Sequence, residues 1–328
     1  PGGGVSFYFK RRGAFDTSFV RGAEVAPRSV AEPLLGREIL EAQDPPIRAV
    51  WITCGNPVAM LPDSTTTARA LETRELVVVV DSFLTDTAAR ATVVLPTTTL
   101  LEADDLLGSY GHHYLGVARP VVAPPPGVRP ELEILQALAA RLGLSHVLEG
   151  DARAWKRRLI EPKLGPHGVT LEALEAGPVL NPLPPKVLFA DRRFPTPSGR
   201  VQLLTTPPAP TQIADGLVLM SLSTEKSQAA QWAVAPRAHL PCTVHPDVAA
   251  AAGVAAGEVA TLISSIGRMD VQVVVDARQR RDVALVPKGG HLARGQCANA
   301  LVAARTTDHG EGGALYDERV RLVPRGAA

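Results

Sequence analysis

Residues 76–96 read LVVVVDSFLTDTAARATVVLP and contain two apolar runs, which a polar segment separates. The runs at residues 76–80 and 92–95 are apolar apart from Thr92, a pattern typical of strands that are buried on both faces of a sheet. Residues 84–90, between the two runs, predict a short helix. The stretch therefore predicts strand, helix and strand in succession, as in a parallel sheet.

The same rhythm continues upstream and downstream of this stretch. Residues 48–53 (RAVWIT) predict a buried strand, and residues 64–75 predict a helix that Ser64 would cap. Residues 131–142 have helical spacing of apolar positions and are followed by Gly143, a residue that often ends helices. Alternating strands and helices predict an α/β domain, with a parallel sheet covered by helices on both faces.

Proline and glycine are frequent over residues 165–210, which predicts a linker or domain junction. Beyond it the pattern changes to short β-rich runs with one short helix at residues 246–252, which is typical of a small β-barrel. We expect an α/β domain over residues 1–190 and a barrel domain over residues 191–328. The predicted barrel strands are residues 217–222, 259–264, 271–275 and 283–286.

Composition excludes several classes of protein. The chain has 328 residues, of which 45% are hydrophobic, and a formal net charge of +1. A net charge this close to zero predicts no basic surface for nucleic-acid binding. The sequence contains no run of about 18 apolar residues, so it predicts no membrane-spanning segment. The three cysteines are far apart in the sequence, so we expect neither a disulfide framework nor a cysteine-ligated metal. We therefore expect a reducing, cytoplasmic setting. The sequence starts at Pro1, and we interpret it as a fragment whose export signal, if any, precedes it.

Two candidate binding segments follow the predicted strands of the first domain. Gly55, Asn56 and Pro57 come after the first strand, at the sheet edge where ligands of α/β proteins bind. Asp81 ends the second strand, where a carboxylate could accept bonds from a guanine edge or ribose, and Thr85 and Thr87 follow it. The alternatives are an ordinary turn for the first segment and helix capping for the second.

Two further candidate segments lie in the second domain. Residues 223–232 could wrap a phosphate and stack an aromatic ring, and residues 287–301 combine glycines with polar side chains. Both segments could also be plain surface loops. Adjacent His112 and His113 make a poor chelate, so we interpret residues 108–116 as a glycine-rich loop that lines a cleft. The candidate binding residues of these two segments are Ser223, Thr224, Lys226, Ser227, Gln228, Trp232, Lys288, His291 and Asn299.

Taken in order, these segments resemble the molybdopterin oxidoreductase family, which includes dimethyl sulfoxide reductase, formate dehydrogenase and nitrate reductase. The resemblance spans residues 48–325. Its motifs are the G-N-P loop at 55–57, VVVVDSFLTDTAARATVVLP at 77–96, Glu102, P-S-G-R at 197–200, residues 245–267 (HPDVAAAAGVAAGEVATLISSIG), and N-A-L at 299–301. Family members usually have Asp where this chain has Thr92, which weakens one expected polar contact.

The resemblance implies a fold and a ligand. The first domain would resemble dinucleotide-binding folds, and the second would be a six-stranded double-psi β-barrel. The ligand would be bis(molybdopterin guanine dinucleotide) with molybdenum or tungsten, which the candidate residues above would contact. The segments that supply the metal ligand and a 4Fe-4S cluster are absent, so we assign no catalytic or metal residue and expect the chain alone to be inert.

We therefore expect partners: the missing N-terminal half or a complementary chain, and an electron-transfer protein. Two alternatives stay open at this point. One is a cofactor-free scaffold subunit of a redox complex, against which the polar loops at 223–228 and 288–299 argue. The other is a free-standing module that binds the pterin dinucleotide.

Overall fold

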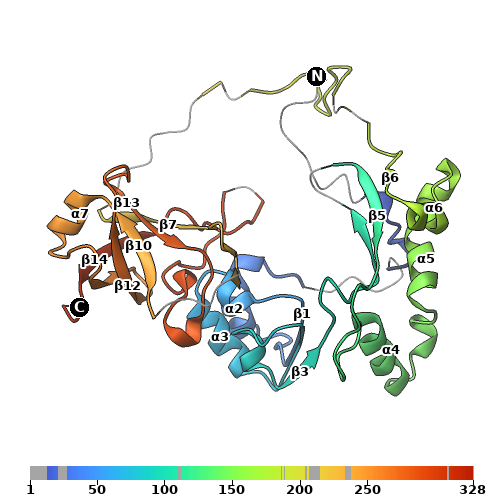
Figure 1. Ribbon diagram of the computed structural model, residues 1–328, viewed down its shortest axis with the longest axis horizontal. Coiled ribbons are helices and arrows are strands. Elements are labelled where there is room, and N and C mark those ends of the chain that lie inside the picture. The colour runs from blue at the N-terminus through green and yellow to red at the C-terminus, as the bar shows by residue number, and fades with distance from the viewer. Residues whose placement is uncertain are drawn as a thin grey trace. The chain divides into compact units, whose positions relative to one another are not determined.

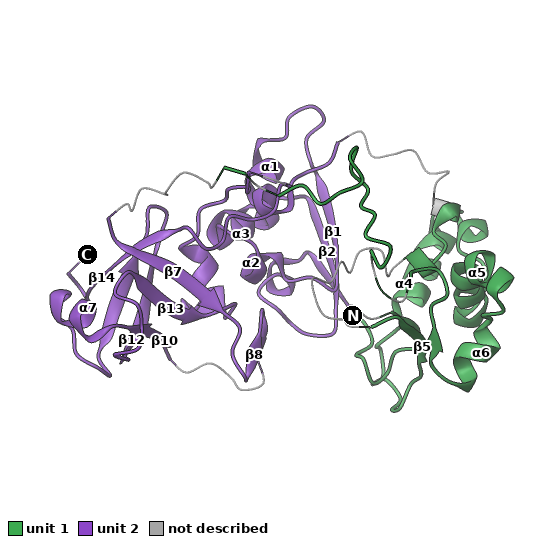
Figure 2. Ribbon diagram, turned by 90° about the horizontal axis from the view of Figure 1, so that it is seen from above, with its two compact units in different colours: residues 1–26, 97–211 green, residues 27–96, 212–328 purple. Residues whose placement is uncertain are grey.

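The computed structural model describes residues 13–20, 28–108, 112–185, 187, 189–203, 205–206, 215–232, 238–308 and 310–327. The chain divides into two compact units (Figure 2): Pro1–Ala26 with Thr97–Thr211, and Pro27–Pro96 with Gln212–Ala328. The second unit thus joins the parallel sheet and the barrel. This grouping follows packing, and the expected domain division at residue 190 stays a prediction.

The predicted parallel sheet is present in the second unit. Its strands are β1 (Ala49–Thr53), β2 (Leu76–Asp81) and β3 (Val93–Pro96), in the order β1-β2-β3. Both pairings are parallel, which confirms the prediction made from the apolar runs. Because β2 is central, its valines are buried, whereas β1 and β3 are partly exposed.

Helices α1 (Leu35–Glu41) and α3 (Ser64–Glu72) of this unit pack on the face of the sheet that carries Val77 and Val79. Val77 and Val79 share that face and form a buried cluster with Ile39 and Leu71 of the helices. On the opposite face Trp51 of β1 is 41% exposed, whereas Val78 and Val80 of β2 are buried. The same layer contains α2 (Pro57–Met60) and the 3-10 turns η3 (Glu32–Leu34) and η4 (Ala88–Arg90).

Two local expectations need correction. The side chain that caps α3 is that of Asp63, which accepts a hydrogen bond from the Thr66 backbone N–H at 3.0 Å, while Ser64 is the first helical residue. The helix expected over residues 84–90 is reduced to the 3-10 turn η4. The Thr85 hydroxyl accepts from the Ala88 N–H at its start, and the Thr87 hydroxyl accepts from the Val58 N–H of another segment.

The second half of the chain forms a closed six-stranded barrel in the order β10-β12-β11-β14-β7-β13. Its core consists of alternating inward residues such as Leu219, Leu262, Val271 and Val286, all nearly inaccessible to solvent. The prediction missed β10 and β14. The strands are β7 (Leu217–Leu222), β10 (Leu240–Val244), β11 (Val259–Ile263), β12 (Arg268–Val275), β13 (Val283–Pro287) and β14 (Arg319–Pro324), with α7 (Pro246–Ala251).

Short elements decorate the barrel. The hairpin β8 (Ser227–Gln228) and β9 (Gln231–Trp232) follows β7, and the 3-10 turns η7 (Leu292–Arg294) and η8 (Ala298–Ala300) follow β13. Figure 1 shows α2 and α3 beside the barrel, in the same compact unit. Leu292, from the segment after β13, packs into the hydrophobic cluster of the parallel sheet.

The first unit has its own small core, around Leu115, Ile160 and Leu171. Residues 105–108 and 114–118 pair as an antiparallel hairpin, so both ends of the expected glycine-rich loop, Gly108 and residues 114–116, belong to strands; residues 109–111 lie outside the described part. The expected linker over 165–210 also holds regular structure. The elements are η2 (Ser18–Val20), β4 (Asp105–Gly108), β5 (Tyr114–Ala118), α4 (Glu131–Arg141), η5 (Ser145–Val147), α5 (Ala152–Leu164), η6 (Gly165–His167), α6 (Leu171–Ala176) and β6 (Val179–Leu180).

No helix among the described residues is both long enough and apolar enough to cross a membrane.

Candidate functional site

The two predicted segments of the α/β layer meet at one side-chain contact. Asn56 Oδ1 accepts a hydrogen bond from the Thr87 hydroxyl at 2.8 Å and a longer one from its backbone N–H at 3.3 Å. The Thr87 hydroxyl in turn accepts from the Val58 backbone N–H at 3.1 Å, and its side chain is fully buried. The G-N-P loop and the residues after β2 therefore form one hydrogen-bonded edge of the sheet.

The residue before Gly55 has an unusual backbone conformation. Cys54 has a left-handed φ of 48°, and its N–H continues the strand pairing to Val80 O at 2.9 Å. A Cβ added to Gly55 would meet no atom closer than 3.6 Å, an ordinary contact. The packing of this chain alone therefore does not require a glycine at position 55.

Asp81 and Thr85 take part in local turns. Asp81 Oδ1 accepts from the Phe83 N–H at 2.9 Å, and Thr85 Oγ1 accepts from the Ala88 N–H at 3.1 Å. The Asp81 bond closes a turn two residues long and caps no helix, whereas the Thr85 hydroxyl bonds the first N–H of the 3-10 turn η4. Phe83 and Leu84 between them are 71% and 78% exposed, so this loop presents apolar side chains next to the carboxylate of Asp81.

Thr92, where we expected one polar contact to be weakened, also has a defined contact. Its hydroxyl accepts a hydrogen bond from the Val77 N–H at 3.0 Å, and its own N–H donates to Val77 O at 2.8 Å. A polar side chain here ties the start of β3 to the start of β2, so threonine serves the local structure without a carboxylate.

In the barrel half, the hairpin of residues 223–232 packs directly on the loop after β13. Gly289 has a φ of 77°, and a Cβ there would lie 2.1 Å from Ala229 O. The Lys288 N–H donates to Leu222 O at 2.9 Å, which extends the pairing of β13 with β7. The two predicted segments of the second domain therefore lie against each other, and only a glycine permits this close approach.

The polar residues of the hairpin are arranged around two hydroxyls. Thr224 Oγ1 and Ser227 Oγ lie 2.7 Å apart, and the Lys226 N–H donates to Thr224 Oγ1 at 3.3 Å. Ser223, Lys226 and Gln228 are exposed. Trp232 packs on the barrel core, and its buried Nε1 has no hydrogen-bond partner among the described residues.

A junction joins the loop after β13 to the α/β layer. Asp86, which is only 5% exposed, accepts from the Ala293 N–H through Oδ1 at 3.1 Å, and its Oδ2 lies 3.3 Å from His291 Nδ1. Asn299 Nδ2 donates to Ala59 O at 3.0 Å. These contacts give His291 and Asn299, which were predicted to contact a ligand, partners within the protein.

Sequence reasoning missed Asp86. The signal that could have revealed it is charge: Asp86 is the only charged residue between Ser82 and Ala89, inside a segment already assigned to the sheet edge. A lone acid in such a segment is either a solvated turn residue or a buried anchor, and its partner cannot be named from local sequence.

Two of the three cysteines, Cys242 and Cys297, are poor candidates for thiolate chemistry. Burial raises the pKa of the Cys242 thiol to about 12, and burial is also the main cause that raises the pKa of Cys297. The Cys297 sulfur lies 3.2 Å from Ser64 Oγ, so it adds a further contact between the barrel loop and α3. Among the described residues, no group of three or more His, Cys, Asp or Glu is arranged to hold a metal ion.

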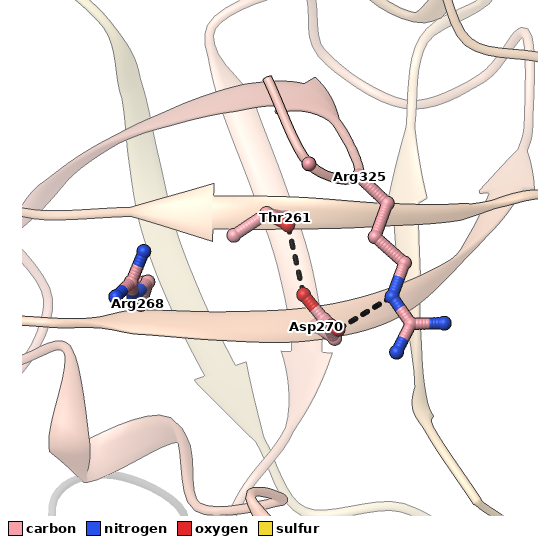
Figure 3. A pocket seen from close by; sticks show the side chains of 5 residues that line it. Thr261, Arg268, Asp270 and Arg325 are labelled. Carbon is pink, nitrogen blue, oxygen red and sulfur yellow. Dashed lines mark hydrogen bonds and ion pairs between the residues drawn. The ribbon is translucent and has the colours of Figure 1, made fainter. Parts of the chain in front are cut away.

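A separate pocket of about 300 Å³ opens on the barrel wall and is lined by Thr261, Arg268, Asp270, Arg325 and Gly326. Asp270 lies between Thr261 and Arg325 (Figure 3), accepting from the threonine hydroxyl at 2.8 Å and pairing with the arginine at 3.0 Å. None of the predicted site residues lines this pocket. The pocket is therefore distinct from the candidate site.

Two family models match the chain. The one described as "Molybdopterin oxidoreductase" matches residues 30–141, and the one described as "Molydopterin dinucleotide binding domain" matches residues 220–318. The first match includes the G-N-P loop and Asp86. The second includes the hairpin of residues 223–232 and the junction loop after β13.

Curated proteins that are similar to this chain include oxidoreductases, and the similarity covers most of the chain. The chain is 28% identical to "Probable oxidoreductase YyaE" of Bacillus subtilis (strain 168) over 90% of its own length and 48% of that protein. It is 26% identical to "Dimethyl sulfoxide/trimethylamine N-oxide reductase" of Rhodobacter capsulatus, over 75% of its length and 36% of that protein. The chain thus spans half or less of the length of these relatives.

Among solved structures, "Acetylene Hydratase from Pelobacter acetylenicus" has a similar fold. The TM-score is 0.68 at 19% sequence identity, over 90% of this chain and 46% of that chain. At this identity the likeness extends to the fold alone.

Proposed function

This chain belongs to the molybdopterin oxidoreductase family, and we propose that it is the C-terminal part of a molybdenum or tungsten oxidoreductase that binds a bis(molybdopterin guanine dinucleotide) cofactor. The two matched domain descriptions and the oxidoreductase relatives support this proposal. Because the chain spans about half of those relatives, we propose that the missing N-terminal half or a complementary chain completes the enclosure, and that an electron-transfer protein is a further partner.

The observation that carries the proposal is the position of residues 85–87. Thr87 bonds Asn56 at the carboxyl edge of the parallel sheet, and Asp86 bonds the barrel loop at Ala293. Ligands of open α/β sheets bind beyond the carboxyl ends of the strands. A dinucleotide at that edge would therefore lie next to the barrel loop, which is what a ligand shared by both layers requires.

The chemistry of the residues present fits such a ligand. Trp232 has a buried Nε1 donor without a partner in the described part of the chain, which costs about 1–3 kcal/mol unless a ligand accepts from it. Lys226, an exposed cation, and Lys288 flank the same hairpin and loop, and phosphates are bound by such cations. Gly55 has room that the protein itself leaves open.

We assign roles on this basis. Asp81 would accept bonds from the guanosine end, next to Gly55, Asn56 and Pro57, and Thr85 and Thr87 would hold the edge in shape. Ser223, Thr224, Ser227 and Gln228 would contact the phosphates or the pterin together with the two lysines. His291 and Asn299, which bond the α/β layer, would shape the loop. The barrel would have the double-psi topology, which its parallel pairs β10–β12 and β7–β13 support.

When bound, the metal and its dithiolenes would supply the redox chemistry, and the protein would orient and shield them. The residues of this chain would hold the dinucleotide tails and exclude water from the pterins. The metal ligand and any 4Fe-4S cluster are proposed to lie in the missing part, so this chain alone would turn over no redox substrate. We propose a cytoplasmic location for it.

The test is analysis of the protein isolated from its own cells with any chain that co-purifies. Molybdenum and tungsten are counted by mass spectrometry, and GMP released by acid hydrolysis is counted per chain. Guanine nucleotide together with either metal supports the proposal. A cofactor-free scaffold subunit would contain neither, and that outcome would reject it.

A further inference from the structure

The carboxylate of Asp86 is buried between two parts of the second unit that lie far apart in the sequence. It is 5% exposed, and 207 residues separate it from Ala293, whose N–H it accepts at 3.1 Å. Buried carboxylates are rare unless they are paired or hydrogen-bonded. Asp86 therefore has a role that its immediate neighbours in the sequence do not explain.

Two basic side chains lie beside this carboxylate. Arg90 NH1 donates to the Asp86 backbone oxygen and lies 3.8 Å from Oδ1, while its Nε pairs with Glu72 at 3.1 Å. His291 Nδ1 lies 3.3 Å from Oδ2, although no donor in the described residues makes a hydrogen bond to that atom. The carboxylate thus lies between Arg90, which follows it in the α/β layer, and His291, which belongs to the barrel loop.

Three more contacts surround this one on the same loop. Asn299 Nδ2 donates to Ala59 O at 3.0 Å, and the Asp63 N–H donates to Val302 O at 2.8 Å. Leu292 packs into the cluster around Val77 and Val79. The loop from residue 291 to residue 302 is therefore anchored on α2, α3 and the sheet, and Asp86 is its one charged anchor among the described residues.

We propose that Asp86 is a positioning residue, which with His291 and Asn299 fixes the barrel loop on the α/β layer and so sets the spacing between the two halves of the dinucleotide site. This inference rests on the proposed function for its ligand. It changes the role of His291 and Asn299, which act through the loop and do not touch the ligand. The two neighbouring residues then have different roles. Thr87 bonds Asn56 of the sheet edge, and Asp86 bonds the barrel loop at Ala293.

The geometry explains why a charge is used here. A single N–H to carbonyl bond between loops contributes only about 0.5–1.5 kcal/mol, whereas bonds to charged groups contribute about 1.5–3 kcal/mol. Asp86 is the position at which a bond to a charged group ties this loop to the α/β layer. The charged anchor supplies that extra stability at one position.

The experiment compares Asp86→Ala, Asp86→Asn and His291→Gln in the full chain, with Asp282→Asn as the control, because Asp282 is a half-exposed carboxylate that pairs with Arg280 at 2.7 Å. Amide hydrogen exchange is measured without ligand, and GDP affinity is measured by calorimetry, with GDP as the probe for the guanosine diphosphate end. Asp86→Ala should speed exchange over residues 291–302 while β2 stays protected, and should weaken GDP binding about tenfold or more, the effect of a lost bond to a charged group.

Asp86→Asn keeps an oxygen for the Ala293 N–H, so it should restore most of the exchange protection and part of the affinity. A double-mutant cycle with His291→Gln should show coupling between the two residues. Unchanged exchange over residues 291–302 in Asp86→Ala would overturn the inference, whatever GDP does. Faster exchange in a chain that never binds GDP would uphold the anchor and would count against the proposed function alone.

Discussion

The hydroxyl of Thr87 donates to Asn56 Oδ1 across 2.8 Å and accepts from the Val58 N–H at 3.1 Å. One buried hydroxyl thus joins the residues after β2 to the loop after β1 and to the first turn of α2. This relationship converts two separate loops into a single edge of the sheet, which the proposed ligand would contact.

Thr87→Val should destabilise the chain because it removes the hydroxyl but keeps the shape. The Val58 N–H and Asn56 Oδ1 would lose their partner, a loss of about 1–3 kcal/mol in the free energy of unfolding. Thr65→Val, at an exposed position of α3, should stay within about 0.5 kcal/mol of the parent. Urea unfolding of both variants tests this, and equal stabilities would show that the hydroxyl bonds contribute nothing.

Gly289→Ala should be far more harmful than Gly295→Ala, although both glycines have left-handed φ angles. A Cβ at Gly289 would lie 2.1 Å from Ala229 O, whereas one at Gly295 meets nothing within 4 Å. Gly295→Ala therefore reports backbone strain alone, about 1–2 kcal/mol. Thermal unfolding should separate the two variants. Similar unfolding temperatures would mean that the hairpin of residues 223–232 does not pack on this loop as described.

Asp81→Ala should lower cofactor retention in the complete enzyme by about 1.5–3 kcal/mol, the range for hydrogen bonds to a charged group. Asp81 Oδ1 also accepts from the Phe83 N–H, so Asp81→Asn is the matched variant that keeps this turn while removing the charge. Guanine nucleotide per chain is measured after dialysis of each variant. Full retention in both would remove Asp81 from the site.

Thiol reactivity should distinguish the three cysteines. Cys54 is exposed, and Cys242 and Cys297 are buried with raised pKa values. A thiol reagent at pH 8 should therefore modify Cys54 alone until the chain unfolds. Because the folded pKa of Cys242 is raised to about 12, its contribution to stability is complete below the ordinary thiol pKa of about 8.5 and is lost as pH rises above it. Labelling followed by peptide mass spectrometry identifies the modified residue, and fast modification of Cys297 in the folded chain would contradict this burial.

The fold could be predicted where strands are unbroken apolar runs. The runs that became β2 and β7 were found because their patterns are strong, and β7 matched residue for residue. β10 was missed because its sequence LPCTV contains Pro241, and proline argues against a central strand. β14 was missed because Arg319 and Arg321 alternate with its apolar residues, so it resembles an exposed segment.

The candidate site could be predicted only in part, for a related reason. Asn56 and Thr87 were selected from their places after strands, and the structure brings them into contact. The role of Asp86 could not be read from the sequence, because its partner Ala293 lies 207 residues away and donates through its backbone. Backbone donors carry no sequence signal, so contacts of this kind emerge only from the folded chain.

The measurement that tests the central claim most directly is the guanine nucleotide content of the isolated protein, counted as GMP released by acid per chain, together with molybdenum and tungsten. The account predicts guanine nucleotide with one of the two metals in the complex, and a lower content of both in the Asp81→Ala variant. A complex that carries neither nucleotide nor metal would contradict it.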